Sequence, residues 1–199
     1  MSRAIASLIP VLVLLVAPVS SFAEEPYPAG SGQVQRPSPV GGLTWTFGGG
    51  AAVPAVGPAR RLPVGGQFGV TIGYRLFDQL LVQAEYSYTA FGFTAPTRNV
   101  VHAGNLNLVL SLVPPSEPVE IYVLAGPGIY GRTAAQLEPA TGVEFGLDAG
   151  MGVSVSLGDP VRLFVEARMQ YLWETVDTFE GPQRVHDLFF PVSIGFRYF

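Results

Sequence analysis

The chain has 199 residues, of which 48% are hydrophobic and only 13% are charged, about half the charged fraction of an ordinary soluble domain. The net charge of −4 and the lack of a basic run do not favour nucleic acid as a partner. The absence of cysteine excludes disulfides, thiolate metal sites, thiol catalysis and lipoprotein acylation. Two histidines far apart in sequence do not predict a metal site, so no metal or other cofactor is expected.

The first 23 residues have the pattern of an export signal. Arg3 supplies a positive start, residues 4–19 are mainly apolar, and small residues stand at Ser21 and Ala23. The apolar run is shorter than the ~20 residues that a membrane-spanning helix needs. A cleaved signal peptide is therefore predicted, with the cut between Ala23 and Glu24, rather than an uncleaved anchor.

Residues 24–40 are rich in Pro, Gly, Ser and Gln and show no apolar period. This composition predicts a flexible lead-in, which would lie in the periplasm after export.

From residue 41 onward, large apolar residues alternate with small or polar ones. The final stretch shows this best, because every second residue from Leu188 to Tyr198 is large and apolar. Alternate side chains of a strand point to opposite faces, so the pattern predicts strands with one apolar face. The eight predicted strands are 43–47, 67–76, 81–89, 105–112, 119–126, 145–157, 161–173 and 187–199.

The connections between these strands alternate in length. Short turns are predicted at 77–79, 114–118 and 158–160, and longer loops at 48–66, 91–99, 131–141 and 174–186. The glycines at 48–50 are expected to be a flexible loop, because no helix follows that would make a nucleotide cradle. Alternating loop lengths are typical of outer-membrane barrels whose two chain ends lie in the periplasm. The sequence thus predicts an all-β fold, an eight-stranded antiparallel up-and-down transmembrane β-barrel over residues 41–199.

The polar face of the strands is mostly Gly, Ser, Thr, Asn and Gln, with few charges. It has too few charges for a surface that meets water, and it suits the narrow interior of an eight-stranded barrel. A membrane barrel is therefore favoured over a soluble, lipocalin-like barrel, in which the apolar face would point inward.

Several charged residues fall on the predicted inner face. Opposite charges in a narrow interior should pair, because an unpaired buried charge is strongly unfavourable. We therefore expect a salt-bridge network that plugs the barrel, with a gated pore or a catalytic carboxylate site as alternatives. The predicted network consists of Arg75, Glu85, Glu120, Asp148, Arg162, Glu166, Arg168 and Arg197.

Aromatic residues gather near both ends of the predicted strands, as in the two belts that mark the headgroup levels of a membrane barrel. A carbohydrate-stacking patch is the alternative. The predicted belt residues are Tyr74, Tyr86, Tyr88, Tyr171, Trp173, Phe196 and Tyr198.

His102 and His186 fall near the predicted outer ends of strands that are not neighbours. Some small outer-membrane barrels are lipid A-modifying enzymes, which need a His with a Ser or a carboxylate at the outer rim. Strand parity places both histidines on the lipid-facing side or in loops, so no catalytic residue is assigned and no enzyme is expected. Arg98 and Arg184, near the two histidines in sequence, are candidates for contacts with lipid phosphates.

The chain resembles the small eight-stranded outer-membrane proteins of the OmpA-transmembrane-domain, OmpX and opacity-protein type. The resemblance rests on the glycine-rich segments 121–128 and 145–153, the Glu-x-Arg strand at 163–168 and the aromatic ending 195–199. It implies that the outer-membrane assembly machinery recognises the terminal Phe199, and that lipid and lipopolysaccharide surround the barrel.

The ending departs from the usual pattern of that group in two ways. Phe199 is out of phase with the apolar set of Ile194, Phe196 and Tyr198. Pro191 has no amide hydrogen and therefore predicts a bulge or a missing hydrogen bond in the last strand.

Together these features predict a monomeric protein of a Gram-negative cell outer membrane, with a structural or adhesive role through four outer loops that meet an extracellular ligand. A narrow channel for ions or small solutes is the alternative. A lipid A-modifying enzyme and a soluble lipocalin-like binder are further candidates.

Overall fold

A computed structural model describes residues 41–57, 62–92, 99–134, 143–178 and 181–199, and the side chains of all but 134 and 174–185 of these. The predicted signal peptide, its cut at Ala23 and Glu24, and the lead-in 24–40 lie outside the described residues. Over the described ranges, no helix has the length and apolar character needed to span a membrane.

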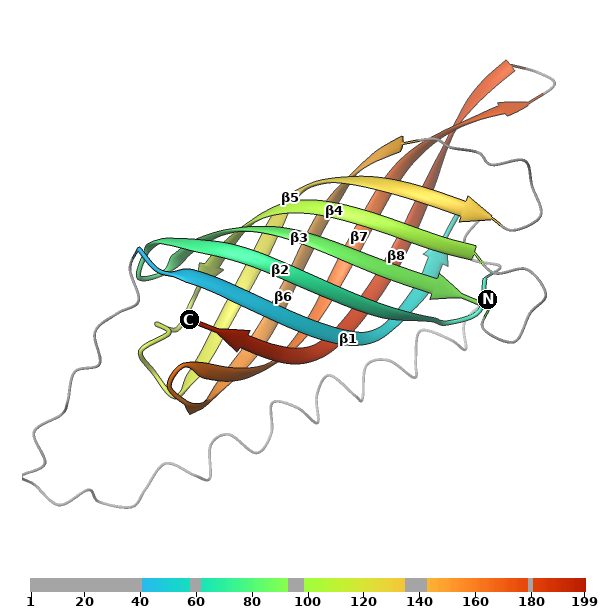
Figure 1. The fold of residues 1–199 in the computed structure, drawn as a ribbon. Coiled ribbons are helices and arrows are strands. Elements are labelled where there is room, and N and C mark those ends of the chain that lie inside the picture. The colour runs from blue at the N-terminus through green and yellow to red at the C-terminus, as the bar shows by residue number, and fades with distance from the viewer. Residues whose placement is uncertain (1–40, 58–61, 93–98, 135–142, 179–180) are drawn as a thin grey trace, which may run out of the picture. The chain divides into compact units, whose positions relative to one another are not determined.

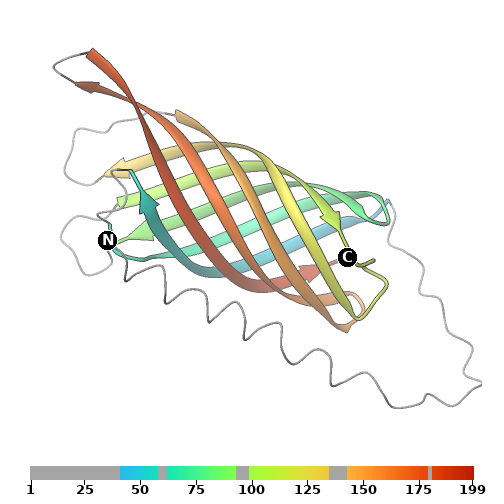
Figure 2. The same ribbon diagram turned by 180° about the vertical axis from the view of Figure 1, so that it is seen from behind.

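Eight antiparallel strands form a closed barrel in which each strand pairs with its neighbours in sequence (Figures 1 and 2). The barrel closes where β1 pairs with β8, from Trp45 opposite Tyr198 to Val56 opposite Leu188. The predicted up-and-down topology is confirmed. The strands are β1 (Leu43–Val56), β2 (Gly65–Phe77), β3 (Leu80–Phe91), β4 (Asn99–Ser111), β5 (Val119–Ala134), β6 (Val143–Gly158), β7 (Val161–Thr178) and β8 (Gly181–Tyr198).

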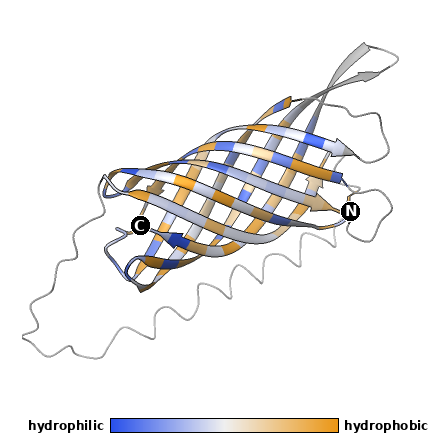
Figure 3. Cartoon of the chain, viewed as in Figure 1, coloured by the Kyte–Doolittle hydropathy of each residue, from blue (hydrophilic) through white to orange (hydrophobic). Residues whose placement is uncertain are grey.

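Hydrophobic and hydrophilic residues alternate along the strands of the barrel wall (Figure 3). On β4, Leu106 and Leu108 are 56% and 50% exposed, whereas the alternating Asn105 and Asn107 are buried inside. The apolar set therefore points outward, as in a barrel surrounded by lipid. The lipocalin-like alternative, which needs this set inside, is wrong.

The strands have two kinds of end. At the turn end, the short connections are Asp78-Gln79, residues 112–118 and Asp159-Pro160. The longer connections lie at the opposite end, which we call the loop end. β4 ends at Ser111, one residue earlier than predicted, and it begins at Asn99 rather than at residue 105.

The predicted loop 48–66 is wrong over its first half, because β1 continues to Val56. Gly48 is part of a continuous ladder with β2 and β8. A Cβ atom at Gly48 would lie 2.8 Å from Cζ of Phe164, whose ring fills the lumen at that point. The glycines at 48–50 are therefore strand residues, and Gly48 makes room for an inward-pointing aromatic ring.

The predicted loop 174–186 is also mostly strand. β7 and β8 pair from Glu174 opposite Val185 to Thr178 opposite Gly181, and this ribbon extends past the ends of the other strands (Figure 1). Backbone hydrogen bonds hold such a ribbon without an apolar period, so the alternation in the sequence does not reveal it. Similarly, β5 reaches Ala134 and β6 begins at Val143, which shortens the predicted loop 131–141.

The two unusual features predicted for the last strand, Pro191 within it and Phe199 at its end, have different structural consequences. The β7–β8 ladder lacks the pairs between Ala167–Val192 and Gln170–Phe189, next to Pro191, and the register does not shift. Pro191 thus causes missing hydrogen bonds and no bulge. Phe199 lies just past β8, where its N–H donates to the carbonyl oxygen of Pro160 (3.1 Å) and its ring centroid is 5.4 Å from the guanidinium carbon of Arg75.

Candidate functional site

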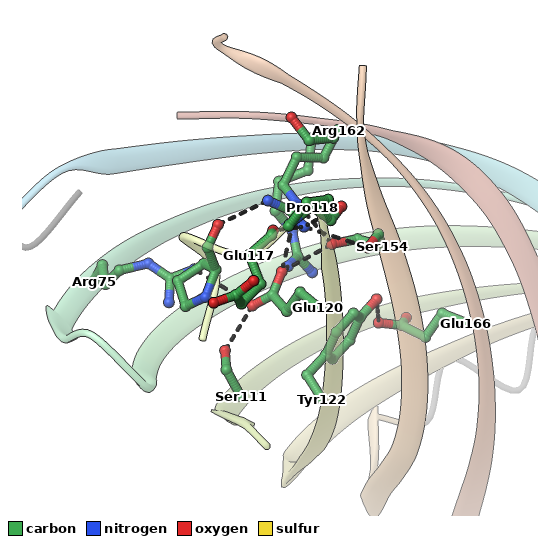
Figure 4. A network of polar contacts seen from close by, with 12 residues as sticks. Arg75, Ser111, Glu117, Pro118, Glu120, Tyr122, Ser154, Arg162 and Glu166 are labelled. Atoms are coloured by element: carbon green, nitrogen blue, oxygen red, sulfur yellow. Dashed lines mark hydrogen bonds and ion pairs between the residues drawn. The ribbon is translucent and has the colours of Figure 1, made fainter. Parts of the chain in front are cut away.

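A cluster around Glu120 occupies the lumen at the turn end (Figure 4). The Glu120 side chain is fully buried and accepts hydrogen bonds from the hydroxyls of Ser111 (2.6 Å) and Ser154 (2.8 Å). Arginines from three other strands make ion pairs with the same carboxylate. They are Arg75 (3.7 Å), Arg162 (3.9 Å) and Arg197 (3.3 Å).

Two of these arginines also fix the short turns. Arg162 donates to the carbonyl oxygens of Pro115 (2.8 Å), Glu117 (3.1 Å) and Pro118 (3.2 Å) between β4 and β5. Arg75 donates to the carbonyl oxygen of Asp78 (2.8 Å) between β2 and β3. At the turn end of the lumen, arginines therefore bind backbone carbonyls and a buried carboxylate together.

A second cluster lies further into the barrel, and in it the carboxylates outnumber the guanidinium groups. The Arg168 guanidinium pairs with Glu85, Asp148 (2.8 Å) and Glu166 (2.5 Å). The Asn107 amide donates to Asp148 (2.9 Å). Three carboxylates thus surround one guanidinium, whereas three guanidinium groups surround Glu120 in the first cluster.

Tyr122 joins the two clusters. Its hydroxyl donates to Glu166 (2.9 Å), and its ring centroid lies 4.7 Å from the guanidinium carbon of Arg197 (Figure 4). Sequence analysis did not single out Tyr122. Its position on the inner face, two residues after Glu120, is the signal that could have identified it.

All eight residues of the predicted charge network are buried, and each makes at least one ion pair within the two clusters. Their formal charges sum to zero, but the turn-end cluster has two net positive charges and the second cluster two net negative charges. In the low dielectric constant of the lumen, the opposite net charges of the two clusters attract each other. This attraction is stabilising only if every charged member of both clusters is present.

A third ionic group was missed by sequence analysis. Arg132 makes ion pairs with the buried Asp187 and with Glu144 (3.9 Å) on three strands near the loop end. Arg132 fell in a predicted loop, because β5 is longer than its apolar alternation indicates. Its even-numbered position, in phase with Glu120 and Tyr122, was the available signal.

An apolar layer lies in the lumen near the loop end, which the mostly polar inner face predicted from the sequence does not indicate. Phe91 and Phe189 stack at its centre with ring centroids 5.5 Å apart. Period-two alternation must turn one of the adjacent Phe189 and Phe190 inward, so this layer follows from the strand phase. It consists of Ala52, Phe91, Val101, Ala103, Tyr130, Leu172 and Phe189, with Leu62 packed against them.

A polar cavity remains between the ionic clusters, with about 20 Å³ open to the centre of a water molecule. A buried water needs roughly 10–15 Å³ by this measure, so the space suits a single water rather than a solute. Its lining includes Thr46, Gln67, Gln83, Glu166, Arg168 and Arg197.

The closed strand order, the outward apolar face and the filled lumen together decide the kind of fold. The chain has the fold of the small eight-stranded outer-membrane β-barrels. No protein-family model matches the chain, and a search of curated proteins finds no match.

Solved structures of this outer-membrane barrel fold are similar over most of the chain. Neisserial surface protein A (NspA) matches with a TM-score of 0.63 and 16% identity, over 78% of this chain and 96% of that one. OprG of Pseudomonas aeruginosa matches with a TM-score of 0.55 and 12% identity, over 80% and 95%. A major outer membrane protein of Thermus thermophilus gives a TM-score of 0.50 and 12% identity, over 78% and 98%. At these identities the likeness concerns the fold alone.

The outward surface of the barrel carries all seven predicted belt aromatics. Tyr74, Phe196 and Tyr198 lie near the turn end, and Tyr86, Tyr88, Tyr171 and Trp173 lie toward the loop end. Trp45, which sequence analysis left out of the belts, pairs directly with Tyr198 near the turn end.

Both histidines lie on the outward face near the loop end, on β4 and β8. His102 Nδ1 lies 2.7 Å from the hydroxyl of Tyr86, and His186 stacks on Tyr171 with ring centroids 5.4 Å apart. Arg98 lies outside the described residues, as does the side chain of Arg184. Among the side chains that the structure describes, no group of three or more His, Asp or Glu residues could hold a metal ion.

Proposed function

We propose that the chain is a non-enzymatic outer-membrane protein whose barrel anchors a binding surface at the cell exterior. In this proposal the turn end faces the periplasm, the loop end faces outward, and the charge clusters plug the lumen. The export-signal pattern of residues 1–23 supports this orientation, as do the short turns at one end. NspA, which is by name a surface protein, has the same fold.

The β7–β8 ribbon is the observation that carries the binding role. The ladder between β6 and β7 ends at Phe145 opposite Trp173, and that between β1 and β8 ends at Val56 opposite Leu188. Beyond these pairs, in the ladders of the described residues, β7 and β8 pair only with each other. A strand edge without a partner can add a strand from another chain through backbone hydrogen bonds.

Shortening the ribbon tests this role. Residues 175–184 would be replaced by an Asn-Gly turn, which closes a two-residue hairpin. We expect cells that express the wild-type chain to aggregate and to adhere to wells coated with fibronectin or laminin, and the shortened variant to lose this adhesion. A variant shortened within residues 135–142 is the matched control and should still adhere.

A gel of the membrane fraction with and without boiling must first show that each variant still migrates as a folded barrel. Equal adhesion by the wild type and the shortened variant, or no adhesion by either, would refute the adhesive role.

A narrow channel is the second candidate. The cavity between the two charge clusters has a polar lining but room for only one water, so conduction would require the clusters to separate. Planar-bilayer recording of the purified barrel tests it. We expect no steady conductance from the wild type, because the apolar layer closes the lumen at the loop end. A Glu166→Ala variant that conducts ions at unchanged stability would instead support a gated pore.

A further inference from the structure

The outward face of the barrel carries two side chains that can take up a positive charge, His102 and His186, as judged from the positions whose side chains are described. The arginines described there point elsewhere: those of the two charge clusters are buried in the lumen, and Arg132 pairs with Asp187 and Glu144. The neighbours of the histidines on this face are mainly aliphatic and aromatic. An ionisable group on a lipid-facing surface is a candidate for function.

The two histidines have matching surroundings. His102 on β4 lies opposite Tyr88 of β3, with ring centroids 5.3 Å apart in an edge contact, and beside Tyr86. His186 on β8 lies opposite Trp173 of β7 and stacks on Tyr171. The strand pairs β3–β4 and β7–β8 lie on opposite sides of an eight-stranded ring. The same arrangement therefore occurs twice, half a turn apart, near the loop end.

Aromatic side chains with a polar tip favour the headgroup level of a membrane. The Tyr86 hydroxyl lies against Nδ1 of His102, which leaves Nε2 for a group outside the protein. Nε2 carries a hydrogen in the tautomer whose Nδ1 accepts from Tyr86, and in the protonated ring. A polar N–H group next to hydrocarbon needs an acceptor. Lipid headgroups supply phosphate oxygens at this depth, and an imidazole donates to a phosphate with added strength when it is protonated.

We propose that His102 and His186 each bind the phosphate group of a lipid in the leaflet at the loop end. The surrounding apolar wall contacts the acyl chains, and the aromatic partners hold the imidazole rings at the headgroup level. This inference rests on the proposed orientation in the outer membrane, where the lipid would be a phosphorylated glycolipid.

Native mass spectrometry of the purified full-length barrel with lipid A is the test. We expect two tightly bound lipid A molecules for the wild type and one for His102→Phe or His186→Phe, because Phe keeps the ring and removes the donor. The double variant should bind about tenfold more weakly, in line with the loss of hydrogen bonds to a charged group. Tyr74→Phe, an outward aromatic near the turn end, is the matched control and should bind like the wild type.

A second readout uses fluorescence in nanodiscs. The chain has two tryptophans, so Trp45→Phe leaves Trp173, next to Tyr171 and opposite His186, as the reporter. Its emission should change when lipid A is added to phosphatidylcholine discs, and not when dephosphorylated lipid A is added.

Three results would overturn the proposal. Equal binding of lipid A by the wild type and the double variant would remove the histidines from the site. Equal binding of dephosphorylated lipid A would assign the contact to the acyl chains. Competition by millimolar inorganic phosphate as effective as that by lipid A would assign the site to the free anion. None of these results depends on adhesion, so loss of the adhesive role and loss of this site can be told apart.

Discussion

At the scale of single residues, Glu120 is the carboxylate on which the turn-end cluster converges. It is buried on β5 and meets three arginines and two hydroxyls from β2, β4, β6, β7 and β8. Removing its charge leaves three guanidinium groups together without their common carboxylate.

We therefore expect Glu120→Gln to destabilise the refolded barrel by about 3–5 kcal/mol, the usual cost of breaking a buried ion pair. Urea unfolding in detergent micelles measures this change in unfolding free energy. Glu117→Gln removes an exposed carboxylate three residues away and should change the unfolding free energy little. Equal stability of the two variants would show that the cluster contributes nothing to stability.

Tyr122 has two separable roles, because its hydroxyl binds Glu166 and its ring faces Arg197. Tyr122→Phe keeps the ring and removes only the hydrogen bond to the carboxylate. We expect a loss of about 1.5–3 kcal/mol in unfolding free energy, and a larger loss for Tyr122→Leu, which also removes the aromatic face. Identical values for Phe and Leu would mean that the ring does not stabilise Arg197.

At the scale of elements, inward aromatic rings are matched to glycines on neighbouring strands. The Tyr122 ring of β5 lies over Gly152 of β6, where a Cβ atom would overlap it. Gly131, further along β5, has no atom near its Cβ position. Comparing the same substitution at these two glycines therefore separates the effect of tight packing from the general effect of replacing a glycine in a strand.

We expect Gly152→Ala to destabilise the barrel by about 1–3 kcal/mol through overpacking, and Gly131→Ala to be neutral or slightly stabilising. Thermal unfolding, followed by the shift in gel mobility of unboiled samples, compares the two. A destabilised Gly131→Ala variant together with an unchanged Gly152→Ala variant would contradict the packing argument.

The period-two pattern predicts the faces of the strands well and their ends poorly. Lipid on one side and a narrow lumen on the other constrain every residue of a strand inside the wall, so positions such as Leu106 and Asn107 are assigned by parity. The β7–β8 ribbon lacks this constraint, because backbone pairing alone holds it beyond the wall, and the glycines at 48–50 of β1 lie inside the wall but have no side chains to show the alternation. Their sequences therefore suggested loops.

The charged site shows a similar division. Parity identified the eight inward charges, because few charged residues share the polar face. The partners could not be assigned from sequence, since Glu120 and Arg197 are 77 residues apart and meet only through the stagger of the closed barrel. Arg132 was lost to a predicted loop, so its partner Asp187, on the polar face of the predicted last strand, was left without an assigned role, and the Phe91–Phe189 stack was obscured by the adjacent Phe190.

At the scale of the whole molecule, the lumen contains two unlike layers, ionic at the turn end and apolar near the loop end. A hydrophobic constriction stops ions by excluding water. The Phe91 and Phe189 rings form the centre of that constriction.

We expect the double variant Phe91→Ala, Phe189→Ala to admit water past the apolar layer and to show brief conductance steps in planar bilayers. Phe190→Ala removes the neighbouring outward ring, which is 38% exposed, and should remain silent. If the double variant is folded and equally silent, the ionic clusters alone seal the barrel.

The paired clusters also bear on how the chain finds its register. Sliding one strand past its neighbour by two residues keeps every apolar side chain outside, so the apolar pattern cannot tell such alignments apart. The charges can. A slip of this size on β8 would move Arg197 away from Glu120 and Tyr122, and would move Asp187 away from Arg132. Ion pairs of this kind add modestly to net stability, but they distinguish the native closure of the barrel from slipped closures that lipid would accept equally well. They do so only once β8, the last strand, has paired.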